Sequence, residues 1–144
     1  MSAAGDHEGA GPRMLRYGPH DDQWIEVARP AGRSRGTVVL LHGGYWRAPF
    51  TAELMRPLVA PFLDRGWTAA TIEYRRGSAG WAALHDDLLA ALALARSQSA
   101  PDARLALVGH SVGGQLALLG ARAGDAVVAL APVTDLARGY REGI

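Results

Sequence analysis

The stretch Arg104-Leu-Ala-Leu-Val-Gly-His-Ser-Val-Gly-Gly-Gln-Leu-Ala-Leu118 decides the fold of this chain. Its apolar run from Leu105 to Val108 predicts a buried strand, and the residues from about Val112 onward predict a helix. The turn between them reads Gly109-His110-Ser111-Val112-Gly113 and matches the pattern G-x-S-x-G. A serine at such a sharp strand-to-helix turn has strained backbone geometry, so its neighbours two positions away must lack a side chain that would clash.

Ser111 is therefore the candidate nucleophile. The helix that follows it directs free N–H groups and its positive dipole end at the same point, which suits a negatively charged oxygen. The alternative is a glycine-rich turn in an ordinary strand–helix unit, because 18 glycines in 144 residues make such a pattern easy to reach by composition. A strand before the pattern and a helix after it form the context that favours the nucleophile.

A second glycine motif follows another predicted buried strand. The apolar run from Thr37 to Leu41 leads directly into His42-Gly43-Gly44-Tyr45-Trp46. In a parallel sheet the loops after the strand C-termini share one edge. We therefore expect this loop and the Ser111 turn to meet.

The backbone of this loop supplies candidate oxyanion donors. Two consecutive glycines let backbone N–H groups turn outward, so Gly43 or Gly44 is expected to donate to a developing oxyanion. The second donor is expected to be the N–H of Val112, the residue after the serine. Tyr45 and Trp46 are candidate substrate-binding residues or, alternatively, residues that pack beneath the loop.

The rest of the chain alternates predicted strands and helices. Beside the elements above, we predict strands at residues 15–17, 24–27, 67–74 and 126–131, and helices at 49–66 and 81–97. Pro57 is interpreted as a first-turn proline and Gly66 as the residue that ends its helix. This alternation predicts an α/β fold with a mostly parallel sheet covered by helices.

The two glycine motifs together resemble the α/β-hydrolase superfamily, and within it the esterase/lipase branch with an H-G-G oxyanion loop. The longer run His42-Gly43-Gly44-Tyr45-Trp46 resembles the kynurenine formamidase (arylformamidase)-like group, as do Glu73-Tyr74-Arg75 and Asp86. The resemblance spans about residues 24–136. It implies a serine hydrolase, carboxylesterase or arylformamidase-like, that acts on an ester or small amide through an acyl-enzyme. It implies no metal and no organic cofactor.

Composition excludes several other classes of protein. The net charge is +1, from 15 basic and 14 acidic side chains, so no basic footprint for nucleic acid or for an anionic membrane is present. The absence of cysteine excludes disulfides, thiolate metal sites and a cysteine nucleophile. Without a signal-peptide pattern or an apolar run near 18 residues, we expect a cytoplasmic protein whose partner is a small-molecule ester or amide.

The histidines leave the proposed chemistry incomplete. A serine nucleophile needs a base, and in this fold the chain order is Ser, then Asp or Glu, then His. No histidine follows His110, so His85 is considered as a substitute base and Asp135 as the acid. His42 is interpreted as a side chain that braces its loop, and His110 as packed or capping. Asp86 is interpreted as a side chain that caps or braces the loops on the substrate side.

The expected organisation is a disordered tail over residues 1–12, followed by residues 13–144 as the N-terminal portion of a single α/β-hydrolase domain. Its C-terminal strands are expected to be missing. Without the base, this chain is expected to have weak activity or none. The competing interpretation is a non-catalytic truncated hydrolase domain that acts as a binding or interaction module. It predicts an open sheet edge beside residues 126–130, at which another chain could pair.

Overall fold

A six-stranded sheet organises the molecule, in the strand order β1-β2-β4-β3-β5-β6. The computed structural model describes residues 11–143, so the predicted tail over residues 1–12 lies almost entirely outside them. The strands are β1 (Arg13–Arg16), β2 (Trp24–Ala28), β3 (Thr37–Leu41), β4 (Thr68–Ile72), β5 (Leu105–His110) and β6 (Ala126–Leu130). The β1–β2 and β2–β4 pairs are antiparallel, and β4, β3, β5 and β6 are mutually parallel. The expected mostly parallel sheet is confirmed.

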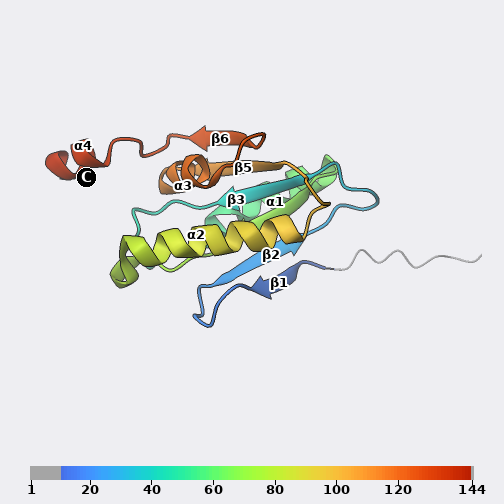
Figure 1. The fold of residues 1–144 in the computed structure, drawn as a ribbon, viewed down its shortest axis with the longest axis horizontal. Coiled ribbons are helices and arrows are strands. Elements are labelled where there is room, and N and C mark those ends of the chain that lie inside the picture. The colour runs from blue at the N-terminus through green and yellow to red at the C-terminus, as the bar shows by residue number, and fades with distance from the viewer. Residues whose placement is uncertain (1–10, 144) are drawn as a thin grey trace, which may run out of the picture.

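Helices cover both faces of this sheet (Figure 1). The helices α2 (Gly80–Ser97) and α3 (Val112–Gly120) pack on one face, and α1 (Arg56–Asp64) packs on the other. The 3-10 helix η1 (Ala52–Met55) leads into α1, and the short η2 (Gly77–Ala79) leads into α2. The last helix, α4 (Leu136–Glu142), follows β6 and extends away from the sheet (Figure 1).

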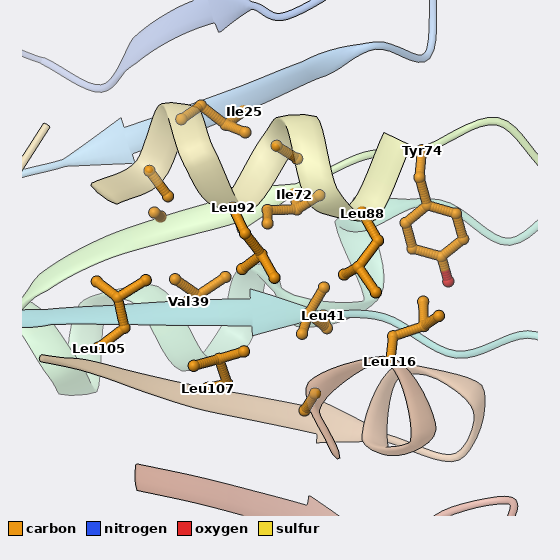
Figure 2. Packing of buried hydrophobic residues seen from close by; sticks show 14 of the residues in the cluster. Ile25, Val39, Leu41, Ile72, Tyr74, Leu88, Leu92, Leu105, Leu107 and Leu116 are labelled. Carbon is orange, nitrogen blue, oxygen red and sulfur yellow. The ribbon is translucent and has the colours of Figure 1, made fainter. Parts of the chain in front are cut away.

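The pleat of the central strands divides the core into two layers. Val39 and Leu41 of β3 face α2 and α3, where Leu88 and Leu116 pack against them (Figure 2). The intervening Val38 and Leu40 face α1 on the opposite side of the sheet. All five residues of β3 and all five of β4 are buried, since helices cover both faces. This two-sided burial explains why these strands show no polar alternation in the sequence.

Two predicted elements differ from the structure at their ends. The predicted helix over residues 49–66 is divided into η1 and α1, and Pro57 lies in the first turn of α1, where its missing N–H leaves no hydrogen bond unmade. Gly66, with φ of 83°, ends α1 in a left-handed conformation, as predicted. The predicted strand over residues 67–74 is shortened to β4, so Glu73 and Tyr74 lie just beyond its C-terminal end.

Strand β6 forms one edge of the sheet and pairs, within residues 11–143, only with β5. Val128 and Leu130 are 47% and 46% exposed there. Leu118 and Leu119 of α3 are also exposed. The open edge expected beside residues 126–130 is therefore present in the part of the chain that is described.

Candidate active site

The two glycine motifs meet at the C-terminal edge of the sheet. Strands β3 and β5 are neighbours, with Leu41 opposite Gly109, so the segments that follow them leave the sheet side by side. Their approach is so close that a Cβ added at Gly43 would lie 2.6 Å from the carbonyl oxygen of His110 and 3.0 Å from Ser111 Cβ. Only glycine allows the 42–52 loop, which joins β3 to η1, to lie against the serine in this way.

Ser111 adopts a strained backbone conformation, with φ of 56° and ψ of −118°. Such a conformation costs of order 1–3 kcal/mol for a residue other than glycine and requires support from its surroundings. The support comes from the segment around β6. The N–H of Ser111 donates to the carbonyl of Leu130 at 2.9 Å, and the carbonyl of Ser111 accepts from the N–H of Val133 at 3.3 Å.

The glycines on either side of the serine are required by close backbone contacts. A Cβ added at Gly109 would lie 2.0 Å from the carbonyl oxygen of Gly113, and one added at Gly113 would lie 2.0 Å from the carbonyl oxygen of Leu41. Both distances are far below van der Waals contact, and both partners are backbone atoms that cannot rotate away. The steric reason inferred for the spacing of G-x-S-x-G is confirmed.

Free backbone donors lie beside the serine. Val112 is the first residue of α3, so its N–H has no partner within the helix. Within residues 11–143, no hydrogen bond occupies the N–H groups of Gly43, Gly44 or Val112. Gly43 and Gly44 line a cavity together with Ser111, whereas Val112 is buried directly after the serine.

An open cavity of about 780 Å³ lies over Ser111. One wall is apolar and comes from the end of the 42–52 loop, η1 and the start of α1; it comprises Phe50, Leu54, Met55, Pro57 and Leu58. Leu130, at the end of β6, and Ala131 and Val133, which follow it, also line the cavity. The sequence reasoning missed the apolar wall because the spacing of Leu54 and Leu58 is equally typical of a helix that faces the core.

The two aromatic residues expected to bind substrate lie in different places. Tyr45 lines the cavity over Ser111 and is 53% exposed. Trp46 lines a separate cavity of about 230 Å³ together with Trp81 and Leu84, and it packs against the main core.

The structure brings no base to the serine within residues 11–143. His110 is exposed and lines the cavity, so the expectation that it is packed or capping is wrong. It is the variable residue of the G-x-S-x-G turn and the one exposed residue of β5. His85 lies next to Trp81 on α2, with ring centroids 6.2 Å apart, and Asp135 caps α4 by accepting the N–H of Arg138 at 2.8 Å. No hydrogen bond joins any of these three side chains to Ser111.

A buried charged network lies beneath the 42–52 loop. His42 is fully buried, with its Nε2 2.7 Å from Glu73 Oε1 and its Nδ1 2.7 Å from the carbonyl oxygen of Gly43. Glu73 also accepts the N–H of Ala52 at 2.9 Å and the Arg76 guanidinium at 2.9 Å. Burial opposes ionisation of Glu73, but the hydrogen bonds from His42 and Ala52 and the charge of Arg76 outweigh it and lower the pKa of the carboxyl.

The same loop contains unusual backbone conformations. Tyr45 and Trp46 have φ of 54° and 57°, and Gly44 before them has φ of 123°. The two non-glycine residues each cost of order 1–3 kcal/mol in this region, so the loop requires support from outside itself. The buried network supplies contacts to this loop, and no local sequence pattern predicts them because the partners are 21 to 32 positions apart.

The residue that braces the neighbouring segment is Asp87 and not Asp86. Asp86 is exposed, whereas Asp87 is buried and accepts hydrogen bonds from the Arg75 guanidinium, the Arg75 N–H and the Gln23 amide at 2.8–3.2 Å. The expectation for Asp86 was wrong by one helix position, because Asp87 lies on the side of α2 that faces the sheet.

The strand order, the strained serine at a strand-to-helix turn and the glycine loop beside it are those of the α/β-hydrolase fold. The BD-FAE family model matches residues 25–138, and the chain belongs to this family. Comparison with curated proteins gave no match.

Solved structures of esterases share the fold. A candidate thioesterase from Silicibacter sp. TM1040 is 26% identical with a TM-score of 0.78, over 92% of this chain and 53% of that one. A thermophilic esterase from Thermogutta terrifontis is 25% identical with a TM-score of 0.63, over 76% of this chain and 43% of that one. Esterase B from Lactobacillus rhamnosis, inhibited by a tributyrin phosphonate, is 25% identical with a TM-score of 0.65, over 78% of this chain and 40% of that one. The chain therefore spans about half the length of the structures it matches, or less.

Residues 11–143 contain neither a candidate membrane-spanning helix nor a candidate metal site. No helix there is both long enough and apolar enough to pass through a bilayer. No three His, Asp or Glu side chains in the same range gather closely enough to share a metal ion.

Proposed function

We propose that this chain supplies the nucleophile and the oxyanion hole of a serine carboxylesterase. Ser111 Oγ attacks the carbonyl carbon of an ester, and the N–H groups of Gly43 or Gly44 and of Val112 donate to the oxygen that becomes negative. Collapse of this intermediate breaks the bond to the leaving alcohol and leaves the acyl group on Ser111, from which water later releases it. The observation that carries the proposal is the meeting of a strained serine and free backbone donors in one cavity.

The proton of Ser111 Oγ must pass to a base, and we place that base outside these 144 residues. Within residues 11–143 no histidine is hydrogen-bonded to Ser111, and in this fold the acid and the base follow the nucleophile in chain order. We therefore propose that residues 13–144 are the N-terminal portion of a single α/β-hydrolase domain. The chain alone then forms its acyl-enzyme slowly, through the oxyanion hole and binding.

The cavity indicates the class of substrate. Its wall at Phe50, Leu54 and Leu58 is apolar, and this supports an ester whose acyl group is a short or medium hydrocarbon chain. Tyr45 adds an aromatic face at the rim. An N-aryl formamide is the second substrate to test, because the loop His42-Gly43-Gly44-Tyr45-Trp46 carries the resemblance to arylformamidases.

A burst experiment with added base tests the proposal. The 144-residue chain is mixed with p-nitrophenyl butyrate in the presence and absence of imidazole, and p-nitrophenolate is measured against a Ser111→Ala control. Imidazole accepts the Ser111 proton in place of the missing base while the Oγ–C bond forms and the bond to p-nitrophenolate breaks. We expect a burst of about one equivalent per chain that imidazole accelerates, and no burst in the variant.

The same experiment distinguishes the proposed esterase from the competing binding module. A non-catalytic binding module would release p-nitrophenolate no faster than Ser111→Ala at any imidazole concentration. Equal rates in the two proteins would therefore refute the esterase proposal. A panel that replaces the butyrate with an acetate, an octanoate, a thioester and an N-aryl formamide then ranks the substrates by burst rate.

We further propose that two copies of this chain associate through the open edge at β6. Within residues 11–143 the outer side of β6 has no strand partner, and Val128 and Leu130 are exposed on this strand; both are features of an edge that pairs with another strand. Sedimentation velocity tests this, with Val128→Lys as the variant that places a charge on the edge. A concentration-dependent dimer that Val128→Lys abolishes is expected, and a monomer at all concentrations would refute it.

A further inference from the structure

The segment that follows β4, residues 73–77, makes an unusual set of contacts with the 42–52 loop. Glu73 holds both ends of the loop, the His42 ring at the start and the Ala52 N–H at the end. The carbonyls between these ends are also bonded. Gly77 N–H donates to the carbonyl of Trp46 at 2.7 Å, and Arg76 Nη2 donates to the carbonyl of Ala48 at 2.9 Å.

Two further hydrogen bonds act on the peptide groups that carry the candidate oxyanion donors. The Tyr74 hydroxyl donates to the carbonyl of His42 at 2.6 Å, and His42 Nδ1 lies 2.7 Å from the carbonyl of Gly43. A peptide group is planar and trans, so its C=O and the next N–H point in opposite directions. Fixing the carbonyl of His42 therefore fixes the N–H of Gly43, and fixing the carbonyl of Gly43 fixes the N–H of Gly44.

The hydrogen-bond partners of His42 indicate which of its ring nitrogens carry a proton. A carbonyl oxygen only accepts, so Nδ1 must donate to Gly43. Glu73 Oε1 accepts from the Arg76 guanidinium and the Tyr74 N–H, as an ionised carboxylate does, so Nε2 must donate as well. The ring also stacks on Tyr74, with centroids 4.4 Å apart and planes at 9°, an arrangement that favours a cation.

We propose that residues 73–77, acting through a doubly protonated His42 and the Tyr74 hydroxyl, orient the N–H groups of Gly43 and Gly44 toward the oxyanion. This inference rests on the proposed function and assigns Glu73, His42 and Tyr74 as positioning residues. It also explains how the loop keeps Tyr45 and Trp46 at positive φ. The hydrogen bonds at both ends and in the middle of the loop offset the cost of these backbone conformations.

Nuclear magnetic resonance of the 144-residue chain tests this without turnover. At pH 7, the ¹⁵N shifts of the His42 ring are expected to show a proton on both nitrogens. Glu73→Gln is expected to remove one of them. The backbone order parameters of Gly43 and Gly44 are expected near 0.85 in the wild type and below about 0.6 in Glu73→Gln.

Two more variants keep the test decisive if Glu73→Gln folds poorly. Tyr74→Phe removes only the hydroxyl and is expected to lower the order parameter of Gly43 while leaving the His42 ring protonated. Asp125→Asn is the matched control, since it breaks a buried ion pair with Arg96 at the opposite end of the sheet. It is expected to lower stability and to change neither readout.

A wild-type His42 ring with one bare nitrogen would overturn the inference. So would order parameters in Glu73→Gln and Tyr74→Phe that fall no further than in Asp125→Asn. The burst rate with p-nitrophenyl butyrate is expected to fall about tenfold or more in Glu73→Gln, because misplaced catalytic groups lose up to a hundredfold. If the chain gave no burst but showed the doubly protonated His42 ring and the expected order parameters, the proposed function would be refuted. The role of residues 73–77 in orienting the loop would still stand.

Discussion

Replacing Ser111 by glycine or by alanine measures the strain at the candidate nucleophile separately from its chemistry. Ala keeps the Cβ that makes φ of 56° and ψ of −118° unfavourable, whereas Gly removes it. No hydrogen bond within residues 11–143 involves Ser111 Oγ, so both changes lose the same hydroxyl without breaking a contact. The difference in stability between the two variants therefore reports on the backbone.

The expected difference follows from two opposing terms. Relief of the strain is worth about 2 kcal/mol, in the middle of the range for such residues. Gly loses about 0.7 kcal/mol more backbone entropy on folding than Ala. Ser111→Gly should then be about 1.3 kcal/mol more stable than Ser111→Ala. With an unfolding entropy of about 2.1 cal/mol/K per residue, this corresponds to a Tm about 4 °C higher.

Thermal unfolding followed by circular dichroism measures this difference. The control pair is Ser97→Gly and Ser97→Ala at the end of α2, where the backbone is helical and Ala should be favoured by about 0.5–1 kcal/mol. Opposite signs at the two positions are expected. A Ser111→Gly protein no more stable than Ser111→Ala would refute the reasoning that the serine is held in a strained conformation.

Three other changes have defined outcomes. Gly113→Ala should lower the free energy of unfolding in urea by about 2–3 kcal/mol, because the added Cβ meets a backbone oxygen at 2.0 Å. Gly139→Ala in α4, where an added Cβ meets no atom within 4 Å, should be neutral or stabilising. A similar loss of stability in the two variants would contradict the steric argument. Asp125 has its pKa lowered to about 2, first by the hydrogen bond from its arginine partner, so its contribution is present above about pH 4 and is lost as the pH falls toward 2. Asp125→Asn should therefore flatten the acid side of a stability–pH curve, and an unchanged slope would refute this. Leu54→Trp should slow the burst with p-nitrophenyl octanoate more than the burst with the acetate, and so lower the ratio of the two burst rates. Leu119→Trp, at an exposed position of α3, should leave this ratio unchanged. If both variants gave the wild-type ratio, Leu54 would not contact the acyl group.

The parts of the fold that depend on local pattern could be predicted from the sequence. Strands β3 and β5 are apolar runs buried on both faces, and G-x-S-x-G joins β5 to α3 as expected. The motif made both glycines of the turn predictable, but only the clash at Gly109 is local, because the atom that excludes a side chain at Gly113 is the carbonyl oxygen of Leu41 on β3. Helix α1 began later than predicted, since Pro57 can occupy the first turn of a helix but not its interior.

Features that depend on long-range contacts could not be read in the same way. The phase of α2 decides whether Asp86 or Asp87 faces the sheet, and two adjacent aspartates carry no signal that separates them. The role of Glu73 depends on His42, 31 positions earlier in the chain. The apolar wall of the cavity depends on how the 42–52 loop turns, which no periodicity describes.

The intact mass of the chain after treatment with a fluorophosphonate tests most directly whether Ser111 is a nucleophile in an oxyanion hole. The 144-residue chain is incubated with excess reagent beside Ser111→Ala, and the modified peptide is located by mass spectrometry. We predict a single adduct at Ser111, formed slowly and faster with added imidazole, and none in the variant. An unmodified wild-type chain, or adducts spread equally over the serines of both proteins, would contradict the assignment of Ser111 as the nucleophile.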